Sequence, residues 1–155
     1  MRCASLVQSP KDRYMILVNQ STNKRNHMNY VAAVTLLLLL QYLVFIMRAG
    51  MARGSEIKAP AMTGSEDFER KSRVHLNTLE QLMIALPAMW LCAHLANPNL
   101  AAALGLIFFI GRTVYAISYV KEPSKRGIGM GIGMLAYVAM LLIASWKLIA
   151  FMIPS

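Results

Sequence analysis

Four long apolar runs constrain the fold of this chain more than any other feature of its sequence. Residues 28–47 and 127–146 carry no charged side chain, and each run is long enough to cross a bilayer as a helix, which takes about 20 residues. Residues 81–97 are also uncharged, and residues 100–120 carry one internal charge, Arg112. Hydrophobic residues make up 57% of the chain and charged residues only 15%, a balance typical of membrane proteins. We therefore predict an all-α, multi-pass integral membrane protein.

Short connections between the runs indicate an up-down bundle. Residues 97–99 form an Asn-Pro-Asn turn that makes the second and third helices antiparallel neighbours. Pro123 prevents one continuous helix through the third and fourth runs. Residues 48–67 are rich in turn-forming residues and show no helical periodicity, so we predict a loop there and a second helix that begins near Asp67 or Phe68. The expected fold is an up-down bundle of four membrane helices.

Basic residues are distributed unevenly among the connections. Residues 48–73 carry six of them and residues 121–126 carry three, whereas the turn at 97–99 carries none. Because loops rich in lysine and arginine stay in the cytoplasm, we predict that both basic loops are cytoplasmic and that both chain termini lie outside.

The segment 1–27 conflicts with this orientation, because it is polar and carries five basic residues that would have to cross the membrane. We interpret it as a disordered leader, and as an upstream start rather than part of the working protein. The predicted domains are this leader, residues 1–27, and a four-helix transmembrane domain, residues 28–155.

The net charge of +9 does not indicate a nucleic-acid partner. The basic residues lie at the ends of apolar runs and form no stripe interleaved with aromatic residues. The three histidines and two cysteines lack the spacing of a metal site, so we predict none. Four glycines alternate in residues 127–133, but no strand precedes them, and we interpret them as small residues that permit close helix packing.

One polar stretch, residues 66–82, leads directly into an apolar run. Four of its side chains recur at spacings of three, four and three residues, namely Arg70, Arg73, Asn77 and Glu80. At about 100° per residue these form one stripe on a helix. Such a stripe is costly at a membrane unless polar groups meet it, and we expect Arg73 or Arg112 to pair with Glu80. Alternatively, the charges only hold the second and third helices together.

Glutathione matches the chemistry of these groups. Its two carboxylates suit arginine, which binds carboxylates through two hydrogen bonds. Glu80 would bind its ammonium group, Asn77 would pair with a peptide group, and Tyr115 and Tyr119 would donate their hydroxyls. Arg126 lies just beyond the tyrosine face, where its charge would lower the pKa of the thiol from about 8.5 and favour the thiolate.

Three motifs occur in order along the chain: FERxxRxHxNTLE at residues 68–80, GRxxYAxxY at 111–119 and PSKRGIG at 123–129. Together they resemble the MAPEG family, the membrane-associated proteins of eicosanoid and glutathione metabolism, over residues 28–153. Within this family, the motifs of this chain resemble those of the bacterial members, which look like microsomal glutathione transferases. The resemblance implies a four-helix bundle that forms a homotrimer, with glutathione as co-substrate between adjacent subunits near one membrane face.

The resemblance also implies a role for each motif residue. Arg126 is the expected catalytic residue, which stabilises the thiolate. The expected glutathione ligands from the same subunit are Arg73, Asn77, Glu80, Tyr115 and Tyr119. The expected ligands from the neighbouring subunit are Arg53 and His75. At Gln81 some animal relatives have a tyrosine, a difference that bears on the second substrate more than on glutathione.

The position of His75 gives independent support for a shared site. On a helical wheel His75 lies about 180° from the stripe that ends at Glu80. One helix cannot turn both faces to one ligand, but two copies of it can. The alternative interpretation is that His75 is a polar residue at an interface.

These observations predict a membrane-bound glutathione transferase of the bacterial inner membrane, with its active-site face in the cytoplasm. Its thiolate would attack lipophilic electrophiles that enter from the membrane lipid, and a glutathione-dependent peroxidase activity would share the site. The alternative function is a non-catalytic lipid-binding or scaffolding protein of the same fold. A small transporter is a weaker alternative, because the arginines cluster at one face instead of lining a path.

Overall fold

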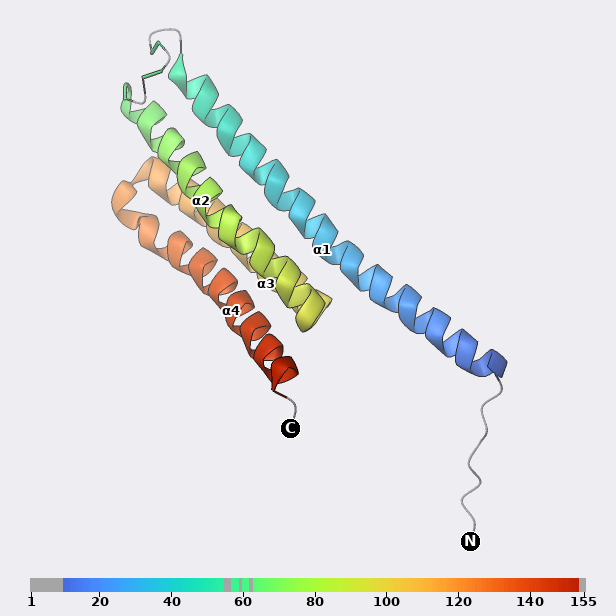
Figure 1. The fold of residues 1–155 in the computed structure, drawn as a ribbon. Coiled ribbons are helices and arrows are strands. Elements are labelled where there is room, and N and C mark those ends of the chain that lie inside the picture. The colour runs from blue at the N-terminus through green and yellow to red at the C-terminus, as the bar shows by residue number, and fades with distance from the viewer. Residues whose placement is uncertain (1–9, 55–56, 59, 62, 154–155) are drawn as a thin grey trace.

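The computed structural model describes residues 10–54, 57–58, 60–61 and 63–153. Its elements are α1 (Pro10–Arg53), α2 (Glu66–Leu95), α3 (Pro98–Lys121), the short 3-10 helix η1 (Pro123–Arg126) and α4 (Gly127–Met152). Consecutive long helices run in opposite directions, with α2, α3 and α4 close together and α1 along one side (Figure 1). The predicted all-α, up-down four-helix bundle is confirmed.

Each long helix contains a segment that is long and apolar enough to cross a membrane. These segments are His27–Arg53, Glu66–Leu95, Pro98–Lys121 and Pro123–Met152, the last of which joins η1 to α4. Large apolar side chains cover the outside of the bundle, and Met83, Leu135 and Leu142 are each about two-thirds exposed or more. Such a surface would be costly in water but is the one that lipid requires. The four predicted spans are confirmed by length and composition.

Helix α1 begins much earlier than the sequence pattern suggested. Residues 10–27 are helical and continuous with the first span, whereas we expected a disordered leader. The physical reason is that no glycine or proline interrupts residues 11–49, and a proline such as Pro10 is well tolerated in the first turn of a helix. In Figure 1 this part of α1 extends beyond the other three helices. Residues 1–9 lie outside the described residues, and the division into leader and domain stays a prediction.

The connection between α1 and α2 is shorter than predicted. Helix α1 continues to Arg53 and ends at Gly54, whose φ of 61° lies in the left-handed region that glycine adopts without strain. Helix α2 begins at Glu66, and Ser65 caps it by accepting a hydrogen bond of 3.3 Å from the Phe68 amide. Arg53 therefore belongs to a membrane helix and not to a loop.

Helices α3 and α4 approach each other backbone to backbone. A side chain at Gly129 would overlap the backbone of Tyr115, and one at Gly111 would lie 2.6 Å from the Gly133 amide nitrogen. By contrast, a side chain at Gly127 would meet open space. The pair Gly129 and Gly133 thus makes the close packing that we predicted for the glycines of residues 127–133. This contact holds the start of α4 against the end of α3.

The interior of the bundle is mainly aliphatic, with a few polar links between helices. Fully buried apolar side chains from every long helix meet there, including Val31, Met89, Phe108 and Met140. Gln41 of α1 donates hydrogen bonds to the Phe109 carbonyl (3.0 Å) and the Thr113 hydroxyl (2.7 Å) of α3. Such links supply hydrogen-bond partners to polar side chains, which lipid cannot do.

Candidate functional site

Two tyrosines of α3 form the back of the candidate site. Tyr115 is fully buried and Tyr119 is half-buried, and their rings stack with centroids 5.5 Å apart and an angle of 19° between the ring planes. The Tyr115 hydroxyl accepts a hydrogen bond of 2.6 Å from the Asn77 amide of α2. This bond joins α2 to α3 and fixes the orientation of both side chains.

The tyrosines face a cavity at the end of the bundle where α3 connects to α4. This first cavity has a volume of about 350 Å³ and is lined by Arg73, Asn77, Tyr115, Tyr119, Arg126 and Met130. Five of the eight residues predicted from the sequence therefore meet in one place. Met130 was not predicted, although it lies one helical turn after Arg126, which directly precedes α4.

The first cavity is electrically positive. Arg73 and Arg126 are both exposed, and neither forms an ion pair with a carboxylate of the described residues. Arg126 directly precedes α4, whose N-terminus adds further positive potential. Two free guanidinium groups beside hydroxyl and amide groups make a site suited to a carboxylate or a thiolate.

The turn that carries Arg126 is held by local polar contacts. Glu122 pairs with Lys125 at 2.7 Å and accepts a hydrogen bond of 2.8 Å from the Ser124 hydroxyl. The hydrogen bonds from Lys125 and Ser124 hold the pKa of Glu122 below its ordinary value. Glu122 therefore stays charged at neutral pH, and its contacts connect the first residue of this turn with Ser124 and Lys125.

Arg53 and His75 lie on the side of α2 that faces away from the first cavity. They line a second cavity of about 200 Å³ between α1 and α2. The Arg53 guanidinium lies over the Phe68 ring, 5.1 Å from its centroid, and the buried Nδ1 of His75 has no hydrogen-bond partner among the described residues. A single chain does not bring these two residues to the first cavity, and their role toward a neighbouring subunit stays a prediction.

Glu80 does not form the ion pair that we expected. It is exposed, lines neither cavity, and makes no salt bridge with Arg73 or Arg112 in the part of the chain that the structure describes. Arg112 instead donates to the Thr78 hydroxyl at 2.7 Å. Thr78 and Glu80 lie about 200° apart on α2, so an arginine that faces one cannot reach the other.

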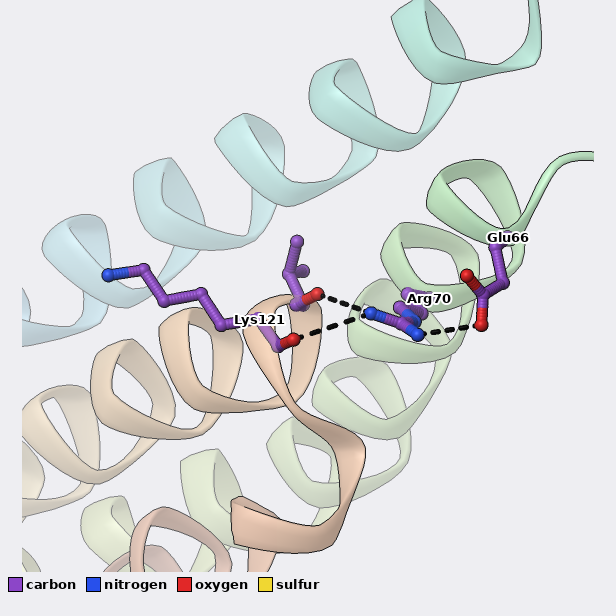
Figure 2. Close-up of polar contacts among 4 residues, drawn as sticks. Glu66, Arg70 and Lys121 are labelled. Atoms are coloured by element: carbon purple, nitrogen blue, oxygen red, sulfur yellow. Dashed lines mark hydrogen bonds and ion pairs between the residues drawn. The ribbon is translucent and has the colours of Figure 1, made fainter.

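Arg70 also has a role different from that of its neighbours in the stripe. It donates to the carbonyl oxygens of Val120 (3.0 Å) and Lys121 (3.4 Å) and pairs with Glu66 at 2.7 Å. Figure 2 shows this guanidinium between the first turn of α2 and the last turn of α3. Because the last carbonyls of a helix lack partners within it, Arg70 caps α3. For this arginine, the interpretation that the charges hold helices two and three together is correct.

Gln81 faces the interior of the bundle. Its side-chain oxygen accepts a hydrogen bond of 3.2 Å from Arg112 and does not line the first cavity. The residue that replaces a tyrosine of some relatives is therefore engaged with a buried cation and not with the cavity.

Comparison with known proteins identifies the family. The sequence profile of the MAPEG family matches residues 30–146, which include all eight candidate residues. The chain belongs to the MAPEG family. This MAPEG protein is 42% identical to an uncharacterised protein of Synechocystis over 122 residues, which cover 76% of this chain and 89% of the relative.

Two mammalian relatives have names that state a function. Human microsomal glutathione S-transferase 2 is 33% identical over 114 residues, which cover 72% of this chain and 78% of the relative. The mouse protein of the same name is 34% identical over 114 residues, which again cover 72% of this chain and 78% of the relative. The predicted family is thus confirmed, and family membership with four apolar helices makes this chain a membrane protein.

Proposed function

We propose that this MAPEG protein is a glutathione transferase that joins the glutathione thiolate to lipophilic electrophiles. The observation that carries the proposal is the first cavity, in which Arg73, Arg126 and two tyrosines surround a space suited to a small anion. Named relatives that are glutathione transferases support the same conclusion.

Each residue of the first cavity has a distinct part in this reaction. Arg73 binds a carboxylate of glutathione, and Asn77 and the tyrosine hydroxyls hydrogen-bond its peptide groups. Arg126 stabilises the thiolate and so lowers the pKa of the bound thiol below about 8.5. The thiolate sulfur then attacks the electrophilic carbon, the new S–C bond forms, and the leaving group departs with its electron pair or the attacked ring opens.

The second cavity supports a site shared between subunits. Arg53 and His75 face away from the first cavity, on the opposite side of α2. In a homotrimer, the second cavity of one subunit would lie against the first cavity of its neighbour, where Arg53 would bind the other glutathione carboxylate. Glu80, exposed on the same helix as Asn77, would bind the glutathione ammonium.

The membrane supplies the second substrate in this proposal. Lipophilic electrophiles would reach the first cavity past Met130, which gives it an apolar edge. Lipid hydroperoxides would react at the same sulfur, with glutathione as the reductant. The connections α1–α2 and α3–α4 lie at the same end of the bundle, and nine basic residues lie in these connections and the adjoining helix ends, within residues 48–73 and 121–126. This face would therefore be cytoplasmic, in a bacterial inner membrane.

A second candidate is a non-catalytic lipid-binding or scaffolding protein. One observation favours it: an apolar cavity of about 320 Å³ opens between α1 and α2, lined by Leu39, Tyr42, Leu79, Leu82, Met83, Leu86 and Pro87. Its size and lining suit an acyl chain. A protein of this kind would bind lipid there without activating glutathione.

A thiolate titration separates the two functions. Detergent-solubilised protein is mixed with glutathione, and the ultraviolet absorbance of the thiolate is followed across pH. We expect a saturable thiolate signal with a midpoint below the pKa of the free thiol, and conjugation of an activated aryl halide. Arg126→Ala should raise this midpoint by at least about one unit, whereas Lys121→Ala, which removes an exposed charge from the same end of α3, should leave it unchanged. Glutathione binding by calorimetry without any thiolate signal would indicate a site that holds glutathione without activating it. Absence of both binding and thiolate signal would support the lipid-binding function instead.

A further inference from the structure

Arg112 is a buried cation that has no acidic partner among the residues that the structure describes. Its side chain is fully buried in the middle of the bundle. The guanidinium donates to two neutral oxygens, the Thr78 hydroxyl at 2.7 Å and the Gln81 amide at 3.2 Å, and its Nε has no partner among the described residues. Burial of an unpaired charge is expensive, and a well-packed apolar side chain would serve packing at lower cost. Helix packing alone therefore does not explain this residue.

The charge of Arg112 lies directly behind the candidate site. Its guanidinium carbon is 4.2 Å from the centroid of the Tyr115 ring. Tyr119 stacks on the same ring at 5.5 Å. Arg112 precedes Tyr115 by three residues and Tyr119 follows it by four, so the two neighbours lie over opposite faces of the ring. The three side chains form a column along α3 that leads from the buried charge to the first cavity.

We propose that Arg112 is a positioning residue that acts through Tyr115, and that its uncompensated charge increases the fraction of bound glutathione present as thiolate. This proposal rests on the proposed function. The field of the charge reaches the cavity because the intervening tyrosine ring and apolar neighbours screen it poorly. The neutral partners Thr78 and Gln81 leave this field intact, whereas a carboxylate in their place would cancel it.

The expected effect is large enough to measure. A unit charge about 10 Å from an anion, in a medium with an effective dielectric constant of about 20, shifts a titration midpoint by roughly one pH unit. Arg112→Gln, which keeps hydrogen-bonding capacity but removes the charge, should therefore raise the thiolate midpoint by about one unit. Arg112→Lys, which keeps the charge, should leave the midpoint within about 0.3 units of the unmodified protein.

A substitution at Thr78 tests the same idea without removing Arg112. Thr78→Asp would give the cation a carboxylate partner, which stabilises the buried charge and should raise the thiolate midpoint by about one unit. Thr78→Asn introduces a side chain of the same size as aspartate but without its charge, so it should leave the thiolate midpoint unchanged. This pair keeps the proposal testable even where Arg112→Gln fails to fold, because a buried cation that gains a partner favours folding.

The outcomes separate this inference from the proposed function. A thiolate signal in the unmodified protein that shifts in Arg112→Gln and Thr78→Asp, but not in Arg112→Lys or Thr78→Asn, supports the role of Arg112. The same signal with an unchanged midpoint in both charge-cancelling variants overturns that role and leaves the transferase intact. Absence of any thiolate in the unmodified protein rejects both proposals.

Discussion

The arginines around the candidate site differ in what their guanidinium groups contact. Arg70 binds the last carbonyls of α3, Arg73 and Arg126 face the first cavity, and Arg112 is buried against Tyr115. Arg70 and Arg73 are only three residues apart on α2, so their different roles follow from a rotation of about 60° around the helix. At the level of single residues, the role of each arginine depends on the group that its guanidinium reaches.

Arg70 and Arg73 offer a matched pair of substitutions. Arg70→Gln should lower the free energy of unfolding by about 1–2 kcal/mol, because it removes the charged donor of the α3 carbonyls. Arg73→Gln should change it by less than about 0.5 kcal/mol but weaken glutathione binding roughly tenfold, because it removes a carboxylate partner. Unfolding in a detergent titration and calorimetry with glutathione measure the two effects. Equal effects of both variants on binding would contradict the separation of roles.

The contact between α3 and α4 determines whether the first cavity exists. Arg126 and Met130 come from the start of α4 or just before it, while the tyrosines come from the end of α3. Gly129 lies against the backbone of Tyr115, so the spacing of the two helices is set where the cavity forms. Glycine at this position is a requirement of the close approach.

Gly129→Val should therefore separate the helices and open the first cavity. We expect a loss of about 1–3 kcal/mol in stability, as for other overpacked contacts, together with loss of the thiolate signal. Gly127→Val is the control, because a side chain at Gly127 meets open space and should alter stability by less than about 0.5 kcal/mol. Thermal unfolding in detergent and the thiolate absorbance report both variants. A tolerated Gly129→Val with normal thiolate would show that the contact is not needed.

On the scale of the whole molecule, one chain presents two separate cavities that contain candidate site residues. The first cavity lies between α2, α3 and α4, and the second lies between α1 and α2. Both line opposite sides of α2 at the same end of the bundle, near the two basic connections. Under the proposed function, a complete glutathione site would combine the first cavity of one copy of the chain with the second cavity of another.

Mixed oligomers test this requirement directly. Arg126→Ala and Arg53→Ala should each abolish most transferase activity when present in every subunit. Subunits of the two kinds, co-expressed with different affinity tags and purified through both, should regain activity, because some interfaces then combine an intact Arg126 with an intact Arg53. Activity of the mixed oligomer no higher than the mean of the two parents would show that each site is built within one chain.

Much of the fold could be predicted because its signals are local. The four spans follow from the lengths of apolar runs, and the turns follow from Pro98, Pro123 and the glycines Gly54 and Gly64. The start of α1 could not be predicted in this way. Its polar first part has no apolar periodicity, and only the absence of a helix breaker between Pro10 and Gly50 pointed to a continuous helix.

The candidate site was only partly predictable. Helical spacing grouped Arg73 with Asn77 and Tyr115 with Tyr119, and the structure brings these residues to one cavity. The expected partner of Arg112 was wrong, because ion pairing was inferred from charge and not from the direction of each side chain.

Short stretches of sequence are enough to predict the membrane helices, their order and the polar stripe of α2, because hydrophobic length and helical period are local properties. The packing of the helices was needed to show that Arg70 caps α3, that Arg112 lies behind Tyr115 with neutral hydrogen-bond partners, and that Arg53 and His75 face away from the first cavity. These outcomes depend on which helix faces pack together, and packing is set by contacts between residues far apart in the chain, such as Gly111 with Gly133.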